Sequence, residues 1–134
     1  MYKITLLTIF SLMLFIGSPT RLSSAAEATI RHLNIASSIN PVTASFIDEQ
    51  IKTANQNIER AILIQLDTPG GLDTAMRDII QAELNSTIPV IVYVAPQGAR
   101  AASAGVLITL AADFAAMAPG SNIGAAHPSG NRPR

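Results

Sequence analysis

The chain has 134 residues, which is enough for one domain and too few for two of ordinary size. Hydrophobic residues make up 49% of it and charged residues only 13%, a low charge content that favours a homo-oligomer or a body lying beside a membrane. A formal net charge of zero argues against a nucleic-acid partner, and the absence of cysteine excludes disulfides, thiolate zinc sites and a cysteine nucleophile.

The first 26 residues are typical of an export signal. Lys3 precedes an apolar run over residues 4–17, and small residues close the segment at Ser24-Ala25-Ala26. The run is shorter than the roughly 20 residues that a membrane span needs. We therefore expect residues 1–26 to be a signal peptide, with an uncleaved anchor as the alternative. Residues 27–134 would then form an exported domain, periplasmic or on the extracytoplasmic face of a membrane.

Strands and helices alternate along the rest of the chain. The hydrophobic pattern predicts strands over residues 28–35, 61–66, 88–94 and 114–117, and helices over residues 43–57, from Leu72 onward, and over residues 103–112. Ser45 and Asp48 have the spacing of a capping box for the first helix, Ile58 is expected on its buried face, and Asp73 is placed to cap the second helix.

This alternation predicts βαβ units with right-handed crossovers and a parallel sheet. In such sheets the binding site lies at the carboxyl ends of the strands. Two glycine-bearing loops, residues 68–71 and 98–102, leave that same edge of the predicted sheet. If their strands are neighbours, the two loops face each other.

Ser103 lies at the predicted start of a helix, within residues 98–105 (GARAASAG). Unpaired N–H groups and the helix dipole favour negative charge at this position, and the small flanking residues leave room for a substrate backbone. These features suit a nucleophile that passes through an oxyanion. A serine that only caps a tightly packed helix has the same local sequence, so both interpretations stay open.

Gly70 and Gly71 follow a predicted strand and precede a predicted helix. Without Cβ atoms, these residues can turn their N–H groups toward a carbonyl oxygen, as an oxyanion hole requires. Glycine is also common in an ordinary turn between a strand and a helix. The pair is therefore suggestive only together with Ser103.

A general base for Ser103 is hard to find in the sequence. Lys52 lies on the first helix, upstream of both loops, and no lysine follows it. His127 is the only histidine after Ser103, and it is either a base or a residue of the substrate groove. Arg100 shares a loop with Ser103 and could bind substrate or a neighbouring subunit. The two histidines are too far apart to suggest a metal site, and no phosphate-binding glycine motif is present, so no metal or cofactor is expected.

Five segments resemble successive motifs of the NfeD family, whose members are Clp-like, membrane-associated serine proteases related to signal peptide peptidase A and the crotonases. They are residues 66–72 (LDTPGGL), 89–94 (PVIVYV), 98–105 (GARAASAG), 116–120 (AMAPG) and 123–128 (IGAAHP). The resemblance extends over residues 35–129. Five motifs in the same order make it specific, whereas any one of them alone would not.

The resemblance implies an α/β fold of the Clp/crotonase type with repeated strand–helix units, incomplete at the C-terminus. It implies Ser103 as the nucleophile, with Gly70, Gly71 and the N–H of Ala104 around the oxyanion. It also implies a serine–lysine dyad, but the family's lysine lies on a helix after the His-Pro segment, and the sequence ends at Arg134. Residues 27–134 are therefore expected to be a partial protease domain with little activity of its own.

The substrates that the resemblance implies are apolar segments of stomatin-like membrane proteins. Two other functions remain open from the residues alone. A noncatalytic module could hold an apolar peptide against the sheet edge. A crotonase-type acyl-thioester enzyme would need a basic nucleotide-binding surface, and the scarcity of lysine argues against it.

Overall fold

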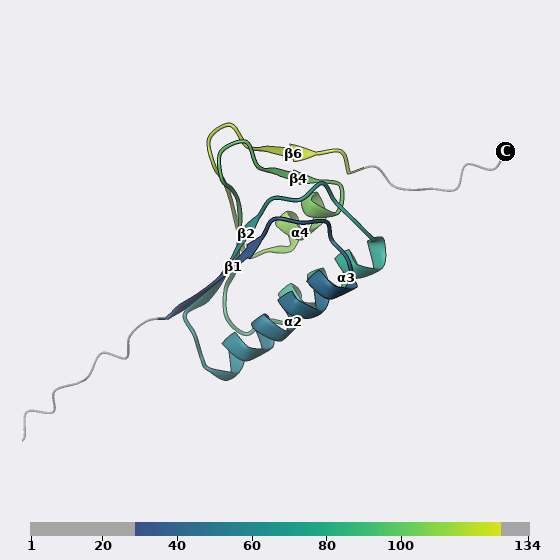
Figure 1. The fold of residues 1–134 in the computed structure, drawn as a ribbon. Helices are drawn as coiled ribbons and strands as arrows, with labels where there is room; N and C mark the ends of the chain where they lie inside the picture. Colours follow the sequence, from purple (N-terminus) through teal and green to yellow (C-terminus); the bar gives the residue numbers. More distant parts are fainter. Residues whose placement is uncertain (1–28, 127–134) are drawn as a thin grey trace, which may run out of the picture.

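The computed structural model of the protein describes residues 29–126, so the expected signal segment and His127 lie outside the described residues. Strands and helices alternate through most of this range (Figure 1). In chain order they are β1 Ile30–Ile35, α2 Pro41–Gln56, β2 Ala61–Leu66, α3 Asp73–Leu84, β3 Val90–Val94, β4 Arg100–Ala102, α4 Ala104–Ala111, β5 Phe114–Met117 and β6 Asn122–Gly124.

Strands β1, β2, β3 and β5 form one parallel sheet in that order, which confirms the predicted βαβ units. Right-handed crossovers that always advance in the same direction place their helices on one face of a sheet. Accordingly, α2 packs beside α3 and α3 beside α4 (Figure 1). Strands β4 and β6 form a separate parallel pair that stands above the main sheet in this view.

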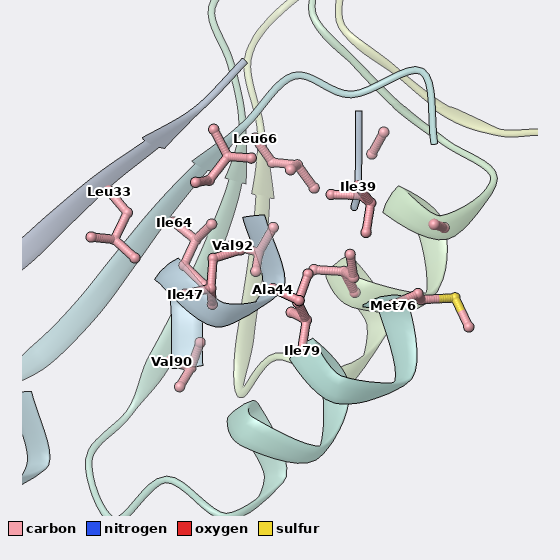
Figure 2. Packing of buried hydrophobic residues seen from close by; sticks show 14 of the residues in the cluster. Leu33, Ile39, Ala44, Ile47, Ile64, Leu66, Met76, Ile79, Val90 and Val92 are labelled. Carbon is pink, nitrogen blue, oxygen red and sulfur yellow. The ribbon is translucent and has the colours of Figure 1, made fainter. Parts of the chain in front are cut away.

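The core lies between the sheet and this helical layer. Alternate residues of the two central strands point into it and are fully buried, among them Ile64 of β2 and Val92 of β3 (Figure 2). Ile47 of α2 and Ile79 of α3 meet them from the helical side. Burial of one such side chain stabilises a fold by about 1.5–3 kcal/mol. The same cluster therefore fixes the positions of α3 and α4, the helices that follow the two glycine-bearing loops.

The first helix begins earlier than the sequence predicts, because Asn40 and not Ser45 caps it. The Asn40 side-chain oxygen accepts hydrogen bonds from the N–H groups of Val42 at 2.9 Å and Thr43 at 3.1 Å. Pro41 then occupies the first helical turn, where a missing N–H costs nothing. The predicted capping box is wrong. The helix also ends before Ile58, which is 85% exposed and has a positive φ of 53°.

Two further predictions about local structure are wrong. Asp73 does not cap α3, because it is the first helical residue and its carboxylate accepts a hydrogen bond from Arg77 Nε at 2.8 Å. Residues 100–102 are not a loop but strand β4, which pairs with β6 in a region rich in glycine and proline. Strands of three residues are too short to show a hydrophobic period, so only the pairing reveals them.

Glu83, near the end of α3, is the one polar side chain of the described residues whose buried carboxylate oxygens have no hydrogen-bond partner. Glu83 as a whole is only 4% exposed. Burial away from water and, to a smaller extent, the nearby negative charge of Asp113 together raise the pKa of this carboxyl to about 8. Glu83 is therefore protonated in the folded protein at neutral pH.

We predict that Glu83→Gln stabilises the protein increasingly as the pH rises. The unfolded carboxyl loses its proton near its ordinary value of 4.5, whereas the folded one keeps it until about pH 8. The folded state thus binds the extra proton in this window, and wild-type stability falls relative to the variant from pH 4.5 to pH 8, by roughly 3–5 kcal/mol in all. Urea unfolding at several pH values measures the difference.

The matched control is Glu49→Gln, because Glu49 lies exposed on α2. Its stability should follow the wild-type curve throughout. A constant offset between Glu83→Gln and wild type, with no growth between pH 4.5 and 8, would contradict the assignment.

Candidate active site

The two glycine-bearing loops leave neighbouring parallel strands at the same rim of the sheet. β2 pairs with β3, and the chain after β2 pairs in turn with β4. Thr68 N–H donates to the Arg100 carbonyl at 2.7 Å, and Ala102 N–H donates to the Thr68 carbonyl at 3.1 Å. The Asp67 carboxylate accepts a further bond from Arg100 N–H at 3.0 Å. These bonds hold the two loops against each other.

Ser103 occupies the sharp turn between β4 and α4. Its backbone has φ 52° and ψ −111°, a conformation that L-residues rarely adopt and that costs about 1–3 kcal/mol. Its N–H is fixed by a hydrogen bond to the Gly124 carbonyl at 3.0 Å. Its side chain is exposed and makes no hydrogen bond within the described residues. A serine presented on a strained strand-to-helix turn has the arrangement of a nucleophile elbow.

The helix that follows Ser103 directs its N-terminus toward the same spot. Ala104 and Gly105 open α4, and their N–H groups have no preceding helical carbonyl to bind. Gly105 allows this helix to approach the β2 loop closely, because a Cβ there would lie 2.6 Å from the Thr68 side chain. Developing negative charge beside Ser103 would therefore meet unpaired donors and the positive end of the helix dipole.

Gly70 lies directly against Ser103. A Cβ at this position would be 2.8 Å from the Ser103 Cβ, and the Gly70 φ of +106° also excludes most side chains. The Gly70 N–H is already engaged, because it donates to the Thr68 hydroxyl at 3.1 Å. Gly70 therefore provides space for Ser103, whereas its N–H group is not free to bind an oxyanion.

Gly71 is held from behind by Ile39. Ile39 N–H donates to the Gly70 carbonyl and Leu72 N–H donates to the Ile39 carbonyl, both at 2.9 Å. Successive peptide groups of an extended segment face opposite sides, so the Gly71 N–H points away from Ile39. No hydrogen bond engages it within residues 29–126. Sequence reasoning missed Ile39, because its role depends on a pairing between distant segments.

Ser103 and Gly71 line one end of an open groove of about 1230 Å³ between α3 and α4. Asp73 and Arg77 are the ionisable residues among its described lining. The other lining residues are Met76, Ile80, Gln81, Leu84, Asn85, Ala104, Leu107, Leu110, Ala111 and Ala126. The serine therefore opens onto a space large enough for several residues of a peptide.

Other predicted site residues lie elsewhere. Arg100 is exposed and lines a separate polar hollow of about 530 Å³ with Asp67 and Asn122, not the groove at Ser103. Lys52 is on α2, where it pairs with Asp48 at 2.6 Å, and it does not line the groove. The structure thus brings Ser103, Gly70, Gly71 and Ala104 together and leaves Arg100 apart.

A family model for the N-terminal domain of NfeD1b matches residues 29–132 of the chain. The chain belongs to the NfeD1b family. This confirms the family that the sequence motifs indicate, and the match covers the whole rim and both glycine-bearing loops.

Two curated relatives of this NfeD1b-family chain are membrane proteins by name. The membrane-bound protease PH1510 of Pyrococcus horikoshii is 43% identical over 116 residues, which cover 87% of this chain and 25% of the relative. The membrane protein NfeD1b of Bacillus subtilis is 34% identical over 126 residues, covering 93% of this chain and 28% of the relative. The chain thus spans about a quarter of the length of the relatives that it matches. None of the helices within residues 29–126 is both long and apolar enough to cross a bilayer.

Solved structures share the fold. A serine-to-alanine variant of the membrane-bound stomatin-specific protease 1510-N matches with a TM-score of 0.68 and 42% identity, covering 78% of this chain and 51% of that one. A lysine-to-alanine variant of 1510-N in complex with a substrate peptide matches with a TM-score of 0.70 and 45% identity. This match covers 76% of this chain and 47% of that one. An asparagine-to-aspartate variant of ClpP1 from Listeria monocytogenes matches with a TM-score of 0.60 and 26% identity. This match covers 69% of this chain and 55% of that one. The predicted Clp-like α/β fold is confirmed.

We predict that Gly71→Ala destabilises the protein by about 1–3 kcal/mol, because the new Cβ would lie 1.9 Å from the Ile39 carbonyl oxygen and would force the paired backbones apart. Gly124→Ala is the control, since nothing lies within 4 Å of a Cβ built there. Urea unfolding of both variants measures the difference. Equal unfolding midpoints for the two variants would show that the Ile39–Gly71 contact is not tight.

Proposed function

We propose that this NfeD1b-family chain carries the nucleophile of a Clp-like serine endopeptidase, and that Ser103 is that nucleophile. The observation that carries the proposal is the position of Ser103 on a strained turn directly against Gly70, in the lining of a peptide-sized groove that Gly71 also lines. The serine-to-alanine variant made of 1510-N supports a serine as the reactive residue in this family.

In the proposed reaction, Ser103 Oγ attacks the carbonyl carbon of the scissile peptide bond, and the electron pair of the C=O bond moves to its oxygen. The N–H groups of Gly71 and Ala104 are the donors best placed to bind this oxyanion, since neither is committed to a carbonyl within the described residues. Gly70 would contribute by letting the serine approach. The serine proton must leave during attack and be delivered to the departing amine.

The base that takes this proton is proposed to be a lysine, as the lysine-to-alanine variant of 1510-N in complex with a substrate peptide suggests. The 134 residues contain two lysines, Lys3 and Lys52, and Lys52 is committed to Asp48 on α2. The chain by itself should therefore react slowly. Serine proteases that lose a triad member keep a rate about 10³–10⁴ above the uncatalysed one, from binding and the oxyanion hole.

The proposed substrate is an apolar peptide segment of a stomatin-like membrane protein, since 1510-N is named as stomatin-specific and its complex holds a substrate peptide. The names of the relatives place them at membranes. We propose that residues 27–134 act on the exported, extracytoplasmic side and assemble as a homo-oligomer. The low charge content of the chain fits a surface that is partly covered by other copies.

A second candidate is a noncatalytic module that only holds apolar peptides. The observation that favours it is the lack of lysine or histidine among the described residues that line the groove. Reaction of Ser103 with an electrophile separates the two, because a pure binding module has no reason to activate its serine.

We predict that a fluorophosphonate probe labels the wild-type chain slowly at neutral pH and that Ser103→Ala abolishes the labelling. The reason is that only a serine next to unpaired oxyanion donors reacts with the probe faster than a surface hydroxyl. Ser37→Ala is the control, because Ser37 is also exposed but lies at the other hollow. In-gel fluorescence measures the adduct, and labelling that survives in Ser103→Ala would refute the proposed nucleophile.

A separate prediction concerns the base. Adding a lysine-bearing segment that follows the His-Pro motif in a relative should raise the rate of labelling by at least about 100-fold, because general-base catalysis contributes about 10²–10⁴-fold. His127→Ala should change the rate little in the extended protein. A loss of labelling in His127→Ala, with no gain from the added lysine, would make His127 the base instead.

A further inference from the structure

Thr68 lies just after β2, and its exposed fraction is 0%. The other buried polar side chains of the described residues are Glu59, Glu83 and Thr109. Glu59 forms an ion pair with β1, and the Thr109 hydroxyl bonds within its own helix. Within residues 29–126, Thr68 is the buried side chain that bonds to the loop with the two consecutive glycines.

The Thr68 hydroxyl holds both polar backbone groups of Gly70. It accepts a hydrogen bond from the Gly70 N–H at 3.1 Å and donates one to the Gly70 carbonyl at 3.3 Å. A hydroxyl can do both at once, because it has one proton to donate and two acceptor positions. The Gly70 carbonyl also accepts a hydrogen bond from the Ile39 N–H at 2.9 Å. Two donors from different segments therefore fix the direction of this carbonyl.

The direction of the Gly70 carbonyl decides the direction of the Gly71 N–H. Both groups belong to one planar peptide unit, and in a trans peptide they point to opposite sides. Because Thr68 and Ile39 hold the carbonyl, the N–H is turned away from both of them. Two consecutive glycines have no Cβ to oppose rotation of the peptide unit between them. Without the bonds to its carbonyl, this unit would be free to leave the orientation that it has in the structure.

The γ-methyl group of Thr68 contacts the other half of the site. A Cβ built on Gly105 would lie 2.6 Å from the Thr68 Cγ2 atom, so the methyl group packs against the first turn of α4. The Thr68 backbone also bonds to β4, at 2.7 and 3.1 Å. One residue thus joins the loop that carries Gly71 to the strand and the helix on either side of Ser103.

We infer that Thr68 is a positioning residue, whose hydroxyl orients the peptide unit between Gly70 and Gly71 so that the Gly71 N–H is ready for an oxyanion formed at Ser103. Its methyl group has a separate role, which is to set the distance between this loop and α4. The inference rests on the proposed function in one respect, that the oxyanion forms beside Ser103 and Gly71. Thr68 is fully buried, so its effect falls on the rate of bond formation and not on binding.

The test uses three variants of the full chain and the fluorophosphonate probe. Thr68→Val keeps the shape of the side chain and removes the hydroxyl, whereas Thr68→Ser keeps the hydroxyl and removes the methyl group. Thr109→Val is the matched control, because Thr109 is 3% exposed and its hydroxyl donates to the Gly105 carbonyl at 2.7 Å, not to the glycine-bearing loop. All variants are labelled well below their thermal midpoints, so that unfolding does not lower the rate.

We expect Thr68→Val to lower the labelling rate at saturating probe by at least about tenfold, because outright removal of an oxyanion donor costs about 10²–10³-fold and this variant releases one. The probe concentration that gives half the maximal rate should stay within about twofold of the wild-type value, since the groove is unchanged. Thr68→Ser and Thr109→Val should keep the wild-type rate within about threefold, because both retain the oriented donor. A merely structural role would make the rate follow the thermal midpoint in all three variants.

A second measurement needs no reaction at Ser103. Rotation of a peptide unit on the μs–ms timescale is detected by NMR relaxation dispersion of its amide signal. We expect dispersion at the Gly71 amide in Thr68→Val, and none in wild type or Thr68→Ser. The Gly70 amide should exchange with heavy water at least about tenfold faster in Thr68→Val, because the variant lacks the hydroxyl that accepts its proton.

The two measurements separate this inference from the proposed function. If labelling depends on Ser103 and Thr68→Val labels as fast as wild type, the inference is overturned and the nucleophile stands. If Ser103 does not react but dispersion at Gly71 appears in Thr68→Val alone, Thr68 positions the peptide unit and the catalytic proposal fails. Unchanged exchange at Gly70 with no dispersion at Gly71 in Thr68→Val overturns the inference directly. So does a rate in Thr68→Ser that falls as far as in Thr68→Val, because packing and not the hydroxyl would then be responsible.

Discussion

The rim of this protein depends on a short stretch of backbone pairing between Thr68 and strand β4. Two hydrogen bonds, from Thr68 to Arg100 and from Ala102 to Thr68, join the chain after β2 to the chain before α4. The neighbouring Asp67 side chain extends this pairing to the Arg100 N–H. Without these bonds Gly71 and Ser103 would lie on independent loops, and loops of that kind rarely hold reacting groups within the fraction of an ångström that catalysis needs.

The strain at Ser103 follows from the same pairing. β4 ends and α4 begins with no residue between them except Ser103, so the reversal of direction falls on a single backbone. The hydrogen bond from its N–H to Gly124 of β6 fixes the residue on the other side. A costly φ of 52° persists because strand, helix and β6 together leave no alternative, which is typical of strained residues at functional sites.

Glycine residues and apolar residues have different roles around Ser103. Gly70, Gly71 and Gly105 permit close approach, since a Cβ at each would lie within 3 Å of a neighbouring atom. The apolar rows of α3 and α4 then form the groove that leads away from the serine. On the strand side, the same two helices are anchored by Ile79 and Ile108, which are fully buried. One face of each helix thus stabilises the fold, while the other lines the groove beside Ser103.

The sequence by itself determined the parallel α/β architecture, because buried parallel strands such as Ala61–Leu66 are almost wholly apolar and the helices between them carry a clear period. It also determined the family and placed Ser103, Gly70, Gly71 and Ala104 among the candidate site residues. These signals lie within short segments of the chain, so they can be recognised without the tertiary structure. The cap at Asn40 was also local, but Asn-Pro reads equally well as a loop, and only the observed backbone distinguishes the two.

Only the tertiary structure decided how the site is arranged. The strands β4 and β6, the support of Gly71 by Ile39 and the engagement of the Gly70 N–H by Thr68 all depend on pairs of segments that are distant or too short to show a period. The position of Arg100 outside the groove and the burial of Glu83 have the same cause. A sequence pattern reports which face of an element is apolar, whereas the partner that meets that face is chosen by the packing of the whole chain.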